Sequence, residues 1–235
     1  MKMSMAVQLG HLSGTVVQTP VKLRNYQKIT IKGGGNYAHI AGTPWMDLQA
    51  YMIQWAAGRQ VTEPSNLGFK LLIDFSGTRL SGEHRFVEIN LLDGSQALFP
   101  KDYDLTPASF QAHDSGNVLY HIANKLTSKW PWIEKIEPHS SSNGDFFVFT
   151  DGNPLQVIHS LIVAKGKYTC AATLPATLWQ SFGQVIETEL KILGSITAID
   201  KCGYRLEINN GCYAQGVAQM HGHIKAGHLD RDAIG

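Results

Sequence analysis

Alternation of apolar and polar residues dominates the chain, in short runs that glycine-containing segments separate. A period of two places one set of side chains on a buried face and the other in solvent, which is typical of half-buried β-strands. The pattern predicts strands at 14–18, 21–32, 37–41, 69–75, 85–92, 96–99, 145–150, 167–172, 195–199, 204–208 and 213–220. Between two of these strands, Asp93-Gly94 predicts a hairpin turn, because both residues adopt positive φ at low cost.

A period of three to four residues replaces the alternation in three segments and predicts helices with one apolar face. The first helix follows Thr43-Pro44, an N-cap with a proline at the first helical position, and spans 44–57. The second spans 117–128, and the third begins after Thr173 and Pro175. Residues 154–165 fit both a helix and a buried strand, and the helix is the preferred interpretation.

These elements predict an α+β fold, mainly antiparallel β-sheet with small-barrel, OB-like character and three or four packed helices. The length of 235 residues allows one large domain or two small ones. A polar run at 139–144 indicates either a long loop or a boundary between an N-terminal half, 1–138, and a C-terminal half, 145–235. One continuous domain is the alternative.

Two stretches, 14–38 and 194–214, follow the same order of glycine, tyrosine and alternating apolar residues. A duplicated three-stranded meander would explain the likeness and would produce paired small barrels or one pseudo-symmetric sheet. Because unrelated antiparallel meanders share these residue types, a chance likeness is the favoured explanation.

Composition excludes some classes of protein. Hydrophobic residues make up 43% of the chain and charged residues 17%, against about 25% charged in an average globular protein, so the chain is not mainly disordered. The 20 Lys and Arg nearly balance the 19 Asp and Glu, for a formal net charge of +1. Affinity for a polyanion therefore has to come from a local patch.

No segment indicates a membrane span or an export signal. The first residues lack the apolar run of a secretory signal, and polar residues interrupt the most apolar stretch, 154–164. The three cysteines, Cys170, Cys202 and Cys212, contain no CxxC pair, which argues against a disulfide framework. We therefore expect a cytoplasmic protein with no membrane partner.

A basic, aromatic strand face is the first functional signal. In the predicted strand 21–32, alternate positions carry cations around a tyrosine, and a run of glycines and a second tyrosine follow. Cations that meet phosphates and rings that stack on bases are what a single-stranded or structured nucleic acid requires. The leading hypothesis is a nucleic-acid-binding protein that uses Lys22, Arg24, Tyr26, Lys28, Lys32 and Tyr37. An ordinary solvated strand face is the alternative.

Histidines near the C-terminus are the second signal. In a strand, His221 and His223 would lie on one face, and His228 could return after a turn as a third ligand. Imidazoles in this number suit a divalent metal such as zinc or manganese, which would activate water in a hydrolase or phosphodiesterase. The H-x-H pattern is short, so surface or hydrogen-bonding histidines are the default interpretation.

A third interpretation is a structural or protein-interaction module, which would expose an apolar patch, for example around Trp130 and Trp132. The chain lacks the G-x-S-x-G, phosphate-loop and G-x-G-x-x-G motifs, which disfavours standard hydrolase, NTPase and dinucleotide enzymes. Whether the protein is an enzyme and whether it oligomerises do not follow from the sequence.

Overall fold

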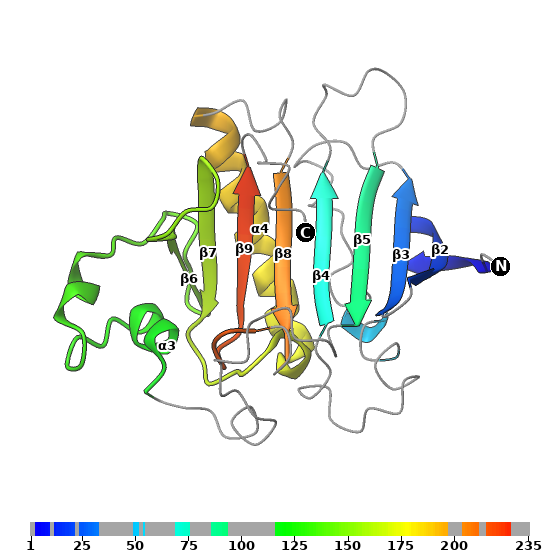
Figure 1. Cartoon of the computed structure of the whole chain (residues 1–235). Helices are drawn as coiled ribbons and strands as arrows, with labels where there is room; N and C mark the ends of the chain where they lie inside the picture. The colour runs from blue at the N-terminus through cyan, green and yellow to red at the C-terminus, as the bar shows by residue number, and fades with distance from the viewer. Residues whose placement is uncertain are drawn as a thin grey trace.

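The protein is built around a nine-stranded antiparallel sheet with the order β1-β2-β3-β5-β4-β8-β9-β7-β6 (Figure 1). The structure is a computed structural model that describes residues 3–9, 12–21, 24–32, 49–51, 54, 69–75, 86–93, 116–196, 204–211 and 215–226. The strands are β1 (Met3–Leu9), β2 (Leu12–Val21), β3 (Arg24–Lys32), β4 (Phe69–Phe75), β5 (Phe86–Asp93), β6 (Phe146–Thr150), β7 (Ile158–Ala164), β8 (Tyr204–Asn210) and β9 (His221–Ala226).

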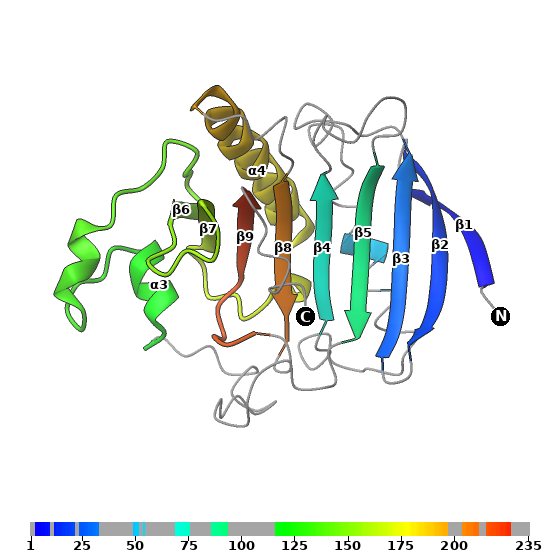
Figure 2. The ribbon, with the colours of Figure 1, turned by 45° about the horizontal axis from the view of Figure 1, so that its top comes forward.

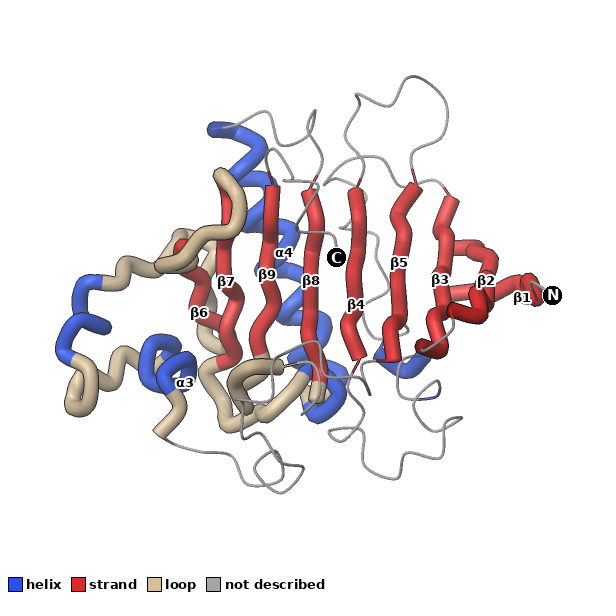
Figure 3. The backbone as a smooth tube through the Cα atoms, in the orientation of Figure 1, coloured by secondary structure: helices blue, strands red, loops and turns tan. Residues whose placement is uncertain are grey.

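Two α-helices with defined bounds and two short 3-10 helices accompany the sheet in the described residues (Figure 3). Helix α3 (Val118–Ala123) begins where the Asn117 side chain accepts hydrogen bonds from the backbone of Leu119 and Tyr120. Helix α4 (Ala176–Ile196) starts directly after Pro175, whose carbonyl accepts the first hydrogen bonds of the helix from Leu178 N and Trp179 N. The 3-10 helices are η3 (Pro131–Lys135) and η4 (Ala171–Thr173).

Helix α4 crosses one face of the sheet behind β7, β9 and β8 (Figures 1 and 2). Its fully buried Trp179 and Phe182 belong to the main hydrophobic core, together with side chains of β4, β6, β7, β8 and β9. A smaller core on the other face joins α3 and η3 to Phe147 and Phe149 of β6 and to Leu161 of β7. The β6–β7 edge of the sheet is therefore covered on both faces.

The strand order has an internal two-fold pattern. From β2 the order is β2-β3-β5-β4, and from β6 it is β6-β7-β9-β8, and the two halves meet where β4 pairs with β8. Strand β4 therefore corresponds to β8, β5 to β9 and β3 to β7. The two central strands are also similar in sequence, FKLLIDF against YRLEINN. The chain repeats one four-strand unit, a topology that two copies of an ancestral unit would produce.

This repeat differs from the meander likeness seen in the sequence. That likeness matched 14–38 with 194–214, so it matched β3 with β8, whereas the topology matches β3 with β7. Strands β4 and β8 have the same length, and aligning their sequences matches Leu72 with Glu207. Leu72 pairs with Asn90 on β5, and Glu207 pairs with His223 on β9, so Asn90 is the counterpart of His223. The β9 histidine therefore has no histidine counterpart in the first unit.

The α+β class with antiparallel sheet is confirmed, but the OB-like barrel is wrong. In the described residues the strands form one open nine-stranded order with β1 and β6 at its edges, not a small closed barrel. The predicted strand 21–32 is also wrong as a single element, because β2 ends at Val21 and β3 begins at Arg24. The predicted helix after Pro175 is confirmed as α4, and the predicted helix at 117–128 is confirmed only over 118–123, as α3. The predicted number of three or four packed helices is not confirmed in the described residues.

Segment 154–165 is the clearest local error, because its centre forms strand β7 instead of a helix. Strand β7 lies between β6 and β9 and is buried on both faces, so it reads as a continuous apolar run without alternation. The segments 167–172 and 215–220 are not strands either, and 195–199 overlaps the end of α4.

Other predictions lie wholly or partly outside the described residues. Of the predicted helix 44–57, residues 49–51 and Gln54 are described and are helical. The Gly94 side of the hairpin turn and the strands 37–41 and 96–99 lie outside the described residues. The halves 1–138 and 145–235 stay a prediction. No helix in the described ranges is long and apolar enough to span a membrane.

Candidate active site

Strand β9 separates its side chains by chemistry. His221, His223 and Lys225 alternate with Gly222 and Ile224, and the buried Ile224 joins the core under α4. Gly222 has to be small, because a Cβ there would lie 2.9 Å from the Phe182 ring of α4. The two histidines and the lysine therefore lie on the opposite face of the sheet, where α4 does not cover them (Figure 1).

Beside them, β7 contributes a third histidine. His159 Nε2 lies 2.9 Å from His223 Nδ1, and the two ring centroids are 5.2 Å apart. On its other side, His159 Nδ1 lies 3.3 Å from Asp151 Oδ2 and 3.3 Å from the backbone nitrogen of Leu155. Asp151 begins the β6–β7 loop and His159 is the second residue of β7, and the hydrogen bond from Asp151 N to His159 O closes the loop at 2.9 Å.

The proton of His159 has two competing positions. The hydrogen bond at His159 Nδ1 comes from Leu155 N at 3.3 Å, and the Asp151 carboxylate lies at ion-pair distance from the same nitrogen. Because a carboxylate can only accept and a charge-assisted bond is about twice as strong as a neutral one, the tautomer with a proton on His159 Nδ1 would pair that proton with Asp151. In that tautomer His159 Nε2 accepts the Nδ1–H of His223, and in the other tautomer it donates to His223 Nδ1. With the proton of His159 on Nδ1, the chain Asp151–His159–His223 leaves His223 Nε2 unprotonated.

His221 is held in the same tautomer by the backbone. Its Nδ1–H donates to the carbonyl of Gln219 at 2.7 Å, so its Nε2 also carries an electron pair. The imidazole is buried, and this burial lowers its pKa despite the opposing hydrogen bond to Gln219. Burial likewise lowers the pKa of His159, against the opposing charge of Asp151. Both rings are therefore neutral at pH 7.

The turn before β9 is itself fixed by two buried glutamines. The Gln215 side chain accepts from Gly211 N at 2.8 Å and donates to the carbonyl of Thr169 at 3.0 Å. The Gln219 side chain donates to the carbonyls of Ala164 and Gly166. These bonds hold the Gln219 carbonyl that orients His221.

A buried ion pair completes the charged part of the site. Lys225 Nζ lies 3.1 Å from Glu207 Oε2, and Glu207 is the register partner of His223 on β8. Asn209 Nδ2 donates to the other Glu207 oxygen at 3.4 Å. Both charged side chains are at most 11% exposed. The Lys225 ammonium group therefore lies near the histidines in a partly desolvated position.

Of the three predicted metal ligands, the structure places His221 and His223 together on one face, and His228 lies outside the described residues. The described residues whose donor atoms are close enough to share a metal ion are Asp151, His159 and His223, all within 4.8 Å of one another. Sequence reasoning missed His159 and Asp151. The available signal was a lone histidine within the apolar run of β7, which only the β7–β9 pairing connects to β9.

The predicted basic face does not converge with these histidines. Arg24, Tyr26, Lys28 and Lys32 lie on β3, and their side chains, as well as Lys22 and Tyr37, lie outside the described part of the chain. Three strands, β5, β4 and β8, separate β3 from β9, a distance of roughly 19 Å at about 4.8 Å per strand.

Comparison with known proteins identifies relatives by fold alone. No protein-family model and no curated protein matches the sequence. An ADP-glucose phosphorylase from Arabidopsis thaliana with bound ADP-glucose matches with a TM-score of 0.56 and 10% identity, over 92% of this chain and 68% of that chain. A uridylyltransferase matches with a TM-score of 0.52 and 12% identity, over 96% of this chain and 68% of that chain.

A histidine triad protein from Clostridium difficile matches over 50% of this chain and 96% of its own, with a TM-score of 0.38 and 22% identity. The hypothesis of a nucleic-acid-binding protein is wrong. It was made from the basic, aromatic strand face, whereas the chain shares its fold with solved enzymes whose names indicate nucleotide chemistry.

Proposed function

We propose that this protein is an enzyme that cleaves a phosphodiester or phosphoanhydride bond of a nucleotide-type substrate at His223. The observation that carries the proposal is the chain of contacts Asp151–His159–His223, which ends on a partly exposed histidine. With the proton of His159 on Nδ1, this chain leaves His223 Nε2 unprotonated. The hydrolase alternative of the sequence analysis is retained, but the group that reacts with the substrate is the His223 imidazole instead of a metal-activated water.

In this proposal His223 Nε2 attacks phosphorus, a P–N bond forms, and the bond from phosphorus to the leaving oxygen breaks. His159 accepts the Nδ1 proton of His223 in a hydrogen bond, and the Asp151 carboxylate stabilises the positive charge that develops on the two rings. The Lys225 ammonium lies on the same face and stabilises negative charge on the phosphoryl oxygens. Water or a second substrate then attacks phosphorus and releases His223.

The fold supports the nucleotide part of the proposal. The solved structures that share the fold over most of the chain are named as an ADP-glucose phosphorylase and a uridylyltransferase. Both names describe transfer at a nucleotide phosphate. The absence of a histidine at the position equivalent to His223 in the first unit supports a single such site among the described strands.

The test is turnover of ADP-glucose and other nucleoside-diphosphate compounds by the whole chain, followed by phosphorus NMR. We expect His223→Ala to lower kcat by about 10⁴-fold or more and His159→Ala by about 10²–10⁴-fold. Gln180→Ala, an exposed change on α4, is the control and should retain wild-type turnover. Equal turnover by His223→Ala and wild-type protein would rule out the proposed site.

A second candidate is the metal-dependent hydrolase, which the proximity of Asp151, His159 and His223 favours. Two imidazoles and a carboxylate are donors that zinc and manganese accept. In that case a bound ion would activate water, and His223 would be a ligand instead of a nucleophile. Elemental analysis of untagged protein separates the two: one equivalent of metal, lost together with activity on chelation, supports the metal enzyme.

A further inference from the structure

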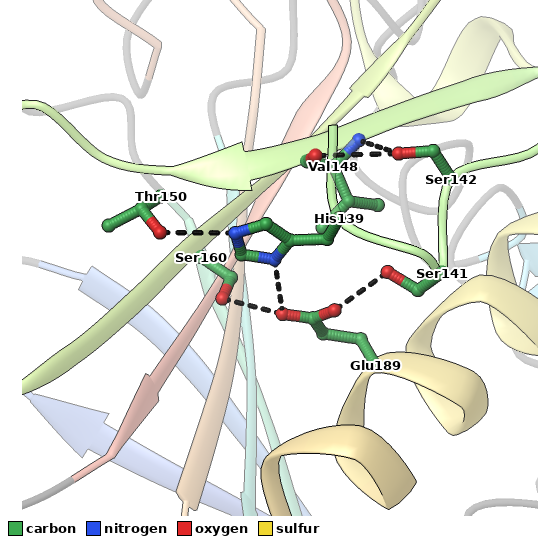
Figure 4. A network of polar contacts seen from close by, with 7 residues as sticks. All are labelled: His139, Ser141, Ser142, Val148, Thr150, Ser160 and Glu189. Atoms are coloured by element: carbon green, nitrogen blue, oxygen red, sulfur yellow. Dashed lines mark hydrogen bonds and ion pairs between the residues drawn. The ribbon is translucent and has the colours of Figure 1, made fainter. Parts of the chain in front are cut away.

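A second polar cluster lies on the α4 side of the sheet (Figure 4). Glu189 of α4 is 1% exposed, and its carboxylate contacts His139, Ser141 and Ser160. Ser160 comes next to His159 on β7, and consecutive strand residues point to opposite faces. The cluster is therefore separated from the β9 histidines by the sheet itself.

The hydrogen bonds of Glu189 keep it ionised. Burial alone would raise the pKa of this carboxyl, but the bonds from His139, Ser141 and Ser160 outweigh that effect and lower it. Ser141 Oγ donates to Oε2 at 2.6 Å, and Ser160 Oγ donates to Oε1 at 2.8 Å. The carboxylate is a fixed acceptor with a defined orientation.

That acceptor determines the tautomer of His139. His139 Nδ1 lies 2.8 Å from Glu189 Oε1, and because the carboxylate has no proton, Nδ1 carries one. In the neutral ring, Nε2 is then an acceptor, and it lies 3.0 Å from Thr150 Oγ1. The Thr150 hydroxyl therefore donates to His139 Nε2, and Figure 4 shows this contact.

The loop that carries His139 is firmly held. His139 N donates to Val148 O at 2.8 Å, and Val148 N donates to Ser142 Oγ at 2.8 Å. The base is thus placed against the end of β6, where Thr150 is exposed to solvent and the His139 side chain is 27% exposed. A small reagent can reach the hydroxyl while the carboxylate behind it stays dry.

We propose that Thr150, His139 and Glu189 form a second nucleophilic site, in which Thr150 Oγ1 accepts an acyl group from small activated carboxylic esters. The three groups have the roles that covalent hydrolysis requires: a hydroxyl nucleophile, a base within hydrogen-bond reach, and a carboxylate that orients the base. The inference does not rest on the proposed phosphate chemistry.

In the proposed reaction, His139 Nε2 carries one proton from the nucleophile to the leaving group. The Thr150 hydroxyl adds to the ester carbonyl, and its proton moves to His139 Nε2. The C–O bond to the leaving group breaks, the leaving group takes that proton, and an acyl ester remains on Oγ1. Water then attacks this ester with His139 as base, which releases the carboxylic acid and restores the hydroxyl.

The experiment uses p-nitrophenyl acetate as the probe and reads both nitrophenol release and the position of the acetyl group by peptide mass spectrometry. We expect acetylation of Thr150 in wild-type protein, none at residue 150 in Thr150→Val, and acetylation at the serine of Thr150→Ser. His139→Gln should lower the rate of acetylation about 10²-fold or more, because the base is lost.

Exposed Thr188, whose hydroxyl donates to the backbone carbonyl of Gln184, is the internal comparison because it has no imidazole partner. It should stay unmodified under conditions that acetylate Thr150. Acetylation confined to lysines, or an unchanged rate in His139→Gln, would overturn the proposal. Circular dichroism of each variant verifies the fold, and Thr150→Val keeps the side-chain volume, so a loss of labelling reports chemistry.

Discussion

At the residue scale, the protein uses fixed acceptors to choose which nitrogen of each histidine carries the proton. A backbone carbonyl does this for His221 and Glu189 does it for His139, and the proposed function assigns the same role to Asp151 at His159. The sequence does not indicate the partners of these histidines. Asp151 lies 8 positions from His159, and Glu189 lies 50 positions from His139. Periodicity could therefore place His221 and His223 on one face but could not identify His159.

The lowered pKa of Glu189 predicts a dependence of stability on pH. Because the folded-state pKa is below the unfolded value of about 4.5, the carboxylate stabilises the fold above that pH, and the contribution is lost as pH falls through the folded-state pKa. Glu189→Gln should remove this acid-dependent part. Urea unfolding midpoints from about pH 6 to about pH 3 should fall less steeply in the variant; parallel curves for the two proteins would contradict the assignment.

At the element scale, strand β9 is positioned by close contact with α4. The sequence predicted α4 well, because its period of three to four residues reflects one buried face against the sheet. Strand β7 was missed for the opposite reason: both faces are buried, so alternation disappears. The break between β2 and β3 was missed because apolar and polar residues keep alternating in the sequence across residues 22 and 23.

Gly222→Ala tests the contact between β9 and α4. The added Cβ would meet the fully buried Phe182 ring at 2.9 Å and Ile208 at 3.5 Å, so we expect a loss of about 1–3 kcal/mol in the free energy of unfolding. Gly144→Ala is the matched control, because nothing lies within 4 Å of the position of its Cβ. Chemical denaturation measures both, and equal stability losses would show that β9 does not depend on this contact.

At the scale of the whole molecule, two four-strand units form one sheet, and only the second carries the histidines at the equivalent positions. The sequence indicated antiparallel sheet and a possible repeat, but the pairing of β4 with β8 involves residues far apart in the chain, which no local pattern reports. The pairing of β8 with β9 brings Glu207 to His223, and the pairing of β7 with β9 brings His159 beside it. The site therefore depends on the order in which the strands pair in the sheet.

The central claim is that His223 Nε2 is the nucleophile, and a covalent intermediate tests it most directly. Whole protein is mixed with ADP-glucose, quenched rapidly in base, in which phosphohistidine is stable, and mapped by peptide mass spectrometry. We predict a phosphorus-containing adduct on His223 that is absent from His223→Ala and reduced in His159→Ala. Turnover of the nucleotide without any adduct on His223, or with the adduct on another residue, would contradict the account.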